Sequence, residues 1–149
     1  PWPLTVAIAA PLAGRLANRI STAWLCAAGA ACLAFGLAAL SLWPLRGSAL
    51  PLVPLTIMCG LGFGLFQVPN NRNMFLSAPS ARAGAAGGMQ ATARLVGQTT
   101  GGIAMSLLFT VASVESAPRV GLAIGAGLTL LAGLVSLLRV EPLREIKQP

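Results

Sequence analysis

The sequence predicts an all-α integral membrane protein, and its composition and the spacing of its charges carry that prediction. Of the 149 residues, 56% are hydrophobic and 9% are charged, whereas a typical soluble domain carries about 25% charged residues. The few charges leave uncharged runs at residues 20–45, 47–71, 95–114 and 120–138. A helix needs about 20 mainly apolar residues to cross a hydrocarbon core of about 30 Å, so each run is long enough for one crossing.

Four transmembrane helices and a partial fifth are expected in this order. Residues 1–12 are uncharged but rich in proline and too short for a span, and they lack the Met and basic region of a signal peptide. We interpret them as the second half of a helix, and the chain as a fragment of a longer protein. The full spans are expected at 23–43, 50–69, 87–111 and 121–138, and a tail at 139–149.

The boundaries of these spans follow from local signals. Trp24 and Trp43 bracket the first full span, as aromatic residues at membrane interfaces do. Pro44 follows it, and proline ends helices because it lacks a backbone donor. Short linkers at 44–49 and 112–120 make their neighbouring spans antiparallel. The linker at 70–86 is longer and more polar.

The basic residues predict the orientation, because Lys and Arg in short loops mark the cytoplasmic side. One side of the expected topology holds only Arg46 and Arg119. The other side holds seven basic residues: Arg15, Arg19, Arg72, Arg82, Arg139, Arg144 and Lys147. We therefore expect a multi-pass protein of the plasma (inner) membrane with a cytoplasmic C-terminus.

Several function classes are excluded by what the sequence lacks. There is no His, and the only acids, Glu115, Glu141 and Glu145, fall outside the expected spans, so no catalytic constellation or metal site is expected. No enzyme activity and no cofactor are predicted. The net charge of +7 is spread singly at the ends of apolar runs, which favours topological charge over nucleic-acid binding.

Glycine is dense within the expected spans, in pairs with Gly-x-x-x-Gly spacing. Such pairs let helix backbones approach closely in lipid. Helix packing is therefore the main interpretation of these residues, and flexing points in a moving helix are the alternative. The glycines assigned to packing are Gly60, Gly64, Gly97, Gly101, Gly102, Gly121 and Gly125.

A polar stripe follows the expected span at 87–111. Gln90, Arg94 and Gln98 recur every four residues, followed by Gly102 and Ser106, so they share one slowly drifting helix face. Polar groups facing lipid are costly, and such a face normally lines a cavity or meets other helices. For Arg94, a snorkelling anchor at the membrane surface is the alternative.

A second polar group ends the preceding span and contains Gln67, Asn70 and Asn71. It is either an ordinary helix exit at the interface or part of the lining of a cavity that opens toward the cytoplasm. The two polar groups together are the transport-path candidates.

Three segments resemble the major facilitator superfamily of secondary transporters. The run Gly14, Arg15, Leu16, Ala17, Asn18, Arg19 resembles its loop motif Gly-x-Leu-Ala-Asp-Arg-x-Gly, with Asn18 in place of Asp. Gly60-x-Gly62-x-Gly64 before Pro69 resembles a late helix of the fourteen-helix drug:proton antiporter branch. The run from Arg94 to Gly101 resembles the start of its penultimate helix, although Leu95 and Gln98 depart from it.

The resemblance implies part of the C-terminal bundle of a major facilitator fold, working by alternating access as a proton-coupled exporter of hydrophobic or cationic compounds. The partners it implies are the lipid bilayer, the N-terminal helices of the same transporter, a small-molecule substrate and protons. A transporter of sugars, acids or metabolites is one alternative. A small four-helix structural or channel subunit is the other.

Overall fold

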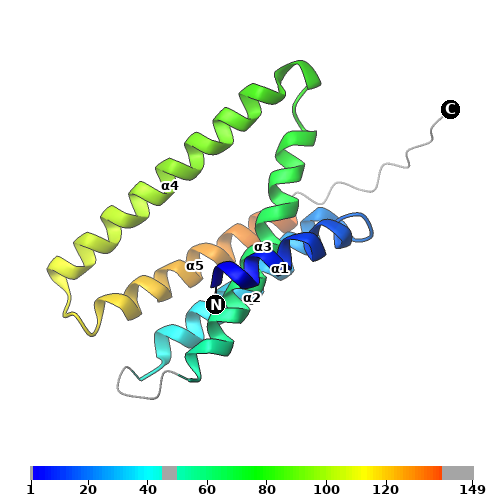
Figure 1. The fold of residues 1–149 in the computed structure, drawn as a ribbon. Helices are drawn as coiled ribbons and strands as arrows, with labels where there is room; N and C mark the ends of the chain where they lie inside the picture. The colour runs from blue at the N-terminus through cyan, green and yellow to red at the C-terminus, as the bar shows by residue number, and fades with distance from the viewer. Residues whose placement is uncertain (1, 45–49, 139–149) are drawn as a thin grey trace.

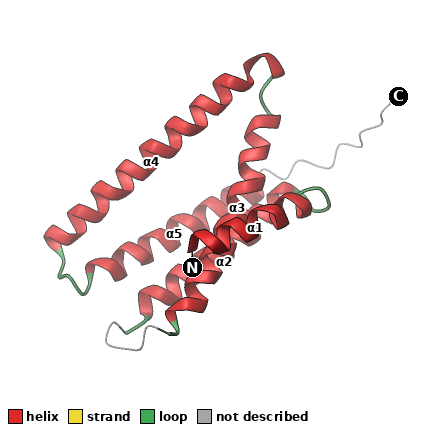
Figure 2. Cartoon of the chain, viewed as in Figure 1, coloured by secondary structure: helices red, strands yellow, loops and turns green. Residues whose placement is uncertain are grey.

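The computed structural model describes residues 2–44 and 50–138, and every regular element in these ranges is a helix. The elements are α1 (Trp2–Leu16), α2 (Thr22–Leu42), α3 (Leu52–Leu76), the short 3-10 helix η1 (Ser80–Arg82), α4 (Ala83–Val111) and α5 (Ala117–Leu138). Figure 2 shows short loops between α1 and α2, between α3 and α4, and between α4 and α5. The tail predicted at 139–149 lies outside the described residues.

Within residues 2–44 and 50–138, three helices are long and apolar enough to cross a membrane: α2, α3 and α5. The prediction of an all-α protein with membrane-spanning helices is therefore confirmed. The fourth expected span, α4, is a helix of 29 residues, but it does not meet the same criteria of composition. Its central residues include Arg94 and several Gln and Thr side chains, which lower its hydropathy.

Helix α3 packs between α1 and α2, and α2 also packs along α5 (Figure 1). Alternate glycines on α3 face different neighbours. A β-carbon at Gly62 would lie 2.5 Å from the backbone nitrogen of Leu33 in α2. A β-carbon at Gly60 or Gly64 would lie 2.9 Å or 2.6 Å from the β-carbon of Thr5 or Ala9 in α1. The absence of side chains lets α3 touch both neighbours.

Helix α4 stands apart from the other helices along most of its length and approaches them only near its two ends (Figure 1). None of its residues is buried. Near its start, a β-carbon at Gly87 would lie 3.4 Å from the Phe75 ring of α3, and near its end Met105 lies against Gly121 of α5.

The helix ends differ from expectation at two prolines. α1 continues through Pro11 to Leu16, beyond the expected end at residue 12. α3 continues through Pro69 to Leu76, so Asn70 and Asn71 lie inside the helix and not in a polar linker at 70–86. The reason is that membrane helices tolerate proline where neighbouring structure packs around it, and the Pro69 side chain is fully buried.

The remaining starts also shift. α4 begins at Ala83 and α5 at Ala117, each four residues before the start expected from the hydrophobic run. At the start of α4 the added residues include Ala83, Ala85 and Ala86, which have high helix propensity. At the start of α5 they include Pro118, which the first turn of a helix tolerates because its missing N–H has no helical partner there. The polar segment between α3 and α4 is correspondingly reduced to residues 77–82.

Candidate functional site

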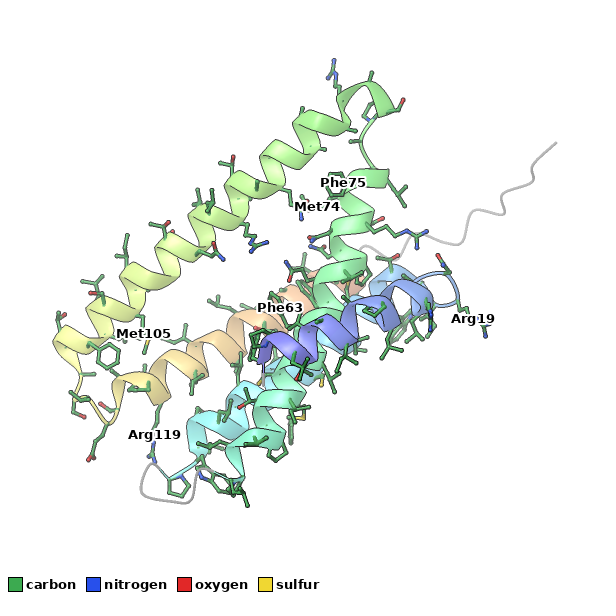
Figure 3. All side chains as sticks on the ribbon, in the orientation of Figure 1. Arg19, Phe63, Met74, Phe75, Met105 and Arg119 are labelled. Atoms are coloured by element: carbon green, nitrogen blue, oxygen red, sulfur yellow. The ribbon has the colours of Figure 1, made fainter. Side chains whose placement is uncertain are left out.

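The polar stripe on α4 lies on the side of the helix that faces the rest of the molecule. Gly87 and Met105, through which α4 touches α3 and α5, lie about five helical turns apart and so share one face. At 100° per residue around the helix axis, Arg94 and Gln98 lie within about 20° of the line through Gly87 and Met105. Gln90 lies within about 60° of the same line. The stripe therefore points toward the other helices. Figure 3 shows Phe75 and Met105 near the two ends of α4.

The opposite face of α4 carries apolar and threonine side chains, and Thr92, Thr99 and Thr110 donate their hydroxyl hydrogen bonds to carbonyls of their own helix. Val96, Ile103 and Leu107 are 59%, 57% and 60% exposed, and each lies about 160–200° from the line through Gly87 and Met105. A helix with one polar and one apolar face at membrane depth places the apolar face toward lipid. This pattern agrees with an inward-facing stripe.

The polar group of α3 lies in the half of that helix that follows Gly64. Gln67, Asn70 and Asn71 are each half-buried, and Gln67 and Asn71 are one turn apart on the same face. Asn70 and Asn71 adjoin the buried ring of Pro69, whose missing N–H leaves the Leu65 carbonyl without its usual helical donor. These amides thus sit beside an interruption in the helical hydrogen-bond ladder.

The polar group of α3 lies toward the end of the molecule where α4 begins, and the stripe of α4 runs from that end to the middle of its helix. The structure does not join the two groups directly. α3 and α4 meet where Phe75 approaches Gly87, beyond the polar group of α3 and before that of α4. Among the described residues, no hydrogen bond connects the side chains of the two groups. What they share is the region between α3 and α4.

The loop motif occupies the end of α1 and the turn after it. Gly14 and Arg15 lie in the last turn of α1, and Asn18 and Arg19 follow in a turn whose amides bond back to the carbonyls of Arg15 and Leu16. Arg72 near the end of α3 donates a hydrogen bond of 2.7 Å to the side-chain oxygen of Asn18. This contact joins the loop motif to the end of α3.

A second long-range hydrogen bond closes the opposite end of the bundle. Arg119, in the first turn of α5, donates from Nη2 to the Trp43 carbonyl at the end of α2, over 3.0 Å. A carbonyl at a helix C-terminus carries partial negative charge, which favours a cationic donor there. Figure 3 shows Arg119 beside the end of α2. The sequence did not predict a contact between Arg119 and Trp43, because only the fold brings these two residues together.

The packing glycines divide into two sets. Gly60 and Gly64 touch α1, Gly121 touches Met105, and Gly125 lies near Leu37 of α2. Gly97, Gly101 and Gly102 on α4 would carry a β-carbon with no neighbour within 4 Å. Close packing at these three positions stays a prediction. Gly29 and Gly36 of α2 were not singled out from the sequence, yet a β-carbon at either would lie 2.5–2.6 Å from α3.

The chain is similar in sequence to curated proteins that are named as a transporter and as a multidrug resistance protein. The chain is 41% identical over 140 residues to the uncharacterized transporter YebQ of Escherichia coli (strain K12), an alignment that covers 94% of the chain and 30% of YebQ. It is 38% identical over 101 residues to the multidrug resistance protein Stp of two Mycobacterium tuberculosis strains, covering 68% of the chain and 19% of Stp. No protein-family model and no solved structure matches the chain.

The chain spans less than a third of the length of either relative. Its similarity to them, together with three apolar helices long enough to span a bilayer, supports a multi-pass membrane transporter as the source of this sequence.

Proposed function

We propose that this chain is the C-terminal segment of a proton-coupled secondary transporter of the major facilitator type, which exports hydrophobic or cationic compounds by alternating access. The observation that carries the proposal is the polar face of α4, which turns Gln90, Arg94 and Gln98 toward the other helices. Similarity to a protein named for multidrug resistance supports the class of substrate.

The chemistry of this face suits a path for poorly polar compounds. Gln90 and Gln98 each offer an amide that both donates and accepts hydrogen bonds, and Gly101 and Gly102 beside them leave room for a ligand or a neighbouring helix. Few polar groups on an otherwise apolar surface are typical of small-molecule sites. On α3, Gln67, Asn70 and Asn71 extend this lining toward the end that we propose faces the cytoplasm.

Proton coupling requires a titrating group that this segment does not supply. Carriers of protons within membranes are usually Asp, Glu or His, and the uncharged runs of the sequence contain none of them. We therefore place the coupling residue in the part of the transporter outside this chain.

The complete transporter, expressed in a drug-sensitive bacterial strain, tests the proposal. Export of a panel of fluorescent cationic and neutral compounds is measured in the parent and in Gln98→Leu, which keeps the side-chain size but loses the amide. We expect altered relative rates among the compounds at unchanged expression. The matched control is Thr100→Val on the outer side of α4. Full activity of both Gln98→Leu and Arg94→Ala across the panel would remove the stripe from the path.

A further inference from the structure

Arg94 carries a charge for which the described part of the chain offers no counterion. It takes part in no ion pair or hydrogen bond among the described residues, and it is exposed on a helix without a buried residue. The only carboxylate in the described ranges is Glu115, which lies beyond the far end of α4. That end, Val111, is about 25 Å from Arg94 along the helix axis at 1.5 Å per residue.

The position of Arg94 along α4 argues against a simple surface anchor. With α4 starting at Ala83, Arg94 lies about 17 Å from the start of the helix. A hydrocarbon core of about 30 Å centred on this helix would place Arg94 about 10 Å inside the core. Charged residues that snorkel to the interface lie near helix ends, whereas an arginine at this depth requires compensation inside the protein.

The same face of α4 is shaped for close approach by another helix. Gly101 lies within about 40° of the line through Gly87 and Met105, and Gly97 within about 80°. A β-carbon at either position would meet nothing within 4 Å. On α2 and α3, by contrast, glycines such as Gly29 and Gly62 lie against backbone atoms of the partner helix, at 2.5–2.8 Å from a β-carbon. Gly97 and Gly101 of α4 also have the spacing of helix-packing glycines, but among the described residues no helix packs against them.

We infer that Arg94 forms an ion pair with a carboxylate on a membrane helix from the part of the transporter outside this chain, and that this helix packs on α4 at Gly97 and Gly101. The relatives provide the length for such a helix, since the chain covers 30% of YebQ. The inference rests on the proposed function in taking the chain as a segment of a longer transporter. It also agrees with cationic substrates, because an uncompensated guanidinium on the path would repel them.

Charge-removal pairs in the complete transporter test this inference. In the Arg94→Ala background, each Asp and Glu in the remaining membrane spans, and also Glu141 and Glu145, is replaced singly by Asn or Gln. Folded yield is measured by size-exclusion chromatography of a fluorescent fusion. We expect Arg94→Ala to lower this yield by about fivefold, since it leaves an unpaired buried charge. One acid-to-amide replacement outside this chain should restore at least half of the loss. Arg82→Ala, just before α4, is the control and should leave the yield unchanged.

Cross-linking locates the same partner without depending on the yield of the charge variants. In a Cys-free parent, Arg94→Cys is combined with Cys at the rescuing position and treated with a mild oxidant. A disulfide should form with Arg94→Cys and not with Ile103→Cys on the opposite face. Formation of this disulfide reports that the two helices are close, whether or not the protein exports drugs. The cross-linking result therefore tests the ion-pair inference separately from the proposed transport function.

Three results would overturn the inference. In the first, no replacement of an acid outside this chain restores the folded yield. In the second, the replacement that restores the yield is at Glu141 or Glu145, so that the partner lies in this chain. Alternatively, Arg94→Ala folds at parental yield and loses only the transport of carboxylate-bearing compounds, in which case the anion belongs to the substrate.

Discussion

The contact between Asn18 and Arg72 links the loop motif to the end of α3, 54 residues later in the sequence. The Arg72 guanidinium bonds to the Asn18 amide oxygen across 2.7 Å, and the contact is exposed. In the family that the loop motif resembles, an Asp occupies the position of Asn18. The neutral amide still accepts the hydrogen bond, but it adds no Coulomb attraction. This contact therefore does not depend on a titrating carboxyl group.

We predict that Asn18→Ala lowers the stability of the complete transporter by about 0.5–1 kcal/mol, because exposed polar contacts contribute little. Asn18→Asp should retain the contact and make its strength depend on salt, since an ion pair is screened. Thermal unfolding in detergent, followed at low and high salt, measures both effects. Arg19→Ala, one residue along the same turn, is the control.

A double-mutant cycle isolates the contact itself. The losses from Asn18→Ala and Arg72→Ala should not add, since each variant removes the same hydrogen bond. Additive losses would mean that Arg72 stabilises the protein through another group.

At the scale of the helices, hydropathy alone located α2 and α5 to within a few residues. It did not show that the helix of the span expected at 50–69 continues through Pro69 to Leu76, where a polar linker was expected. The buried ring of Pro69 instead packs inside α3, and the helix carries three amide side chains beyond it. The sequence also could not show which glycines touch, since Gly29 is identified only by the facing backbone of α3 and Gly36 only by the facing side chain of Cys59.

The contact between α2 and α3 predicts a sharp difference between two glycines. A β-carbon at Gly62 would lie 2.5–2.8 Å from backbone atoms of Leu33 and Gly29, which cannot move without separating the helices. We expect Gly62→Ala to destabilise the transporter by about 3 kcal/mol, at the upper end of overpacking costs. Gly84→Ala, where nothing lies within 4 Å, should be neutral or slightly stabilising. Thermal unfolding of both variants measures the difference. Equal effects would contradict the direct backbone contact.

The two faces of α4 predict different accessibility. In an otherwise Cys-free transporter, Cys in place of Gln98 should react with a small water-soluble thiol reagent, because its face meets the proposed path. Cys in place of Ile103, on the apolar face, should be protected by lipid. A transported compound should slow the labelling at position 98 only. Faster labelling at position 103 than at position 98 would reverse the assignment of the faces.

At the scale of the whole molecule, the least predictable feature was the place of α4. The sequence predicted a span at 87–111 within this helix of 29 residues, but no local signal showed that it would meet α3 and α5 only near its ends. Helix positions depend on long-range packing, and for α4 the glycines suited to packing face open space in this chain. The polar stripe itself was visible from its spacing of four residues. Its direction required the contacts of Gly87 and Met105.

The two long-range hydrogen bonds mark the opposite ends of the bundle and lead to a prediction of topology. The hydrogen bond from Arg72 to Asn18 joins the end of α3, near which α4 begins, to the end of α1. The hydrogen bond from Arg119 to the Trp43 carbonyl joins the start of α5 to the end of α2. The first end also carries Arg15, Arg19 and Arg82. Because basic loops remain in the cytoplasm, we expect that end to face inward.

Labelling in intact cells then separates the two sides. In a Cys-free transporter, Cys in place of Val114, which is 77% exposed between α4 and α5, should react with a membrane-impermeant thiol reagent added outside. Cys in place of Ser80, exposed in η1, should react only after the cells are permeabilised, and a reporter fused after Lys147 should be active in the cytoplasm. The reverse pattern would place the Asn18–Arg72 contact outside the cell. It would also mean that α3 and α4 open their polar groups toward the exterior, so the path would have to be entered from that side.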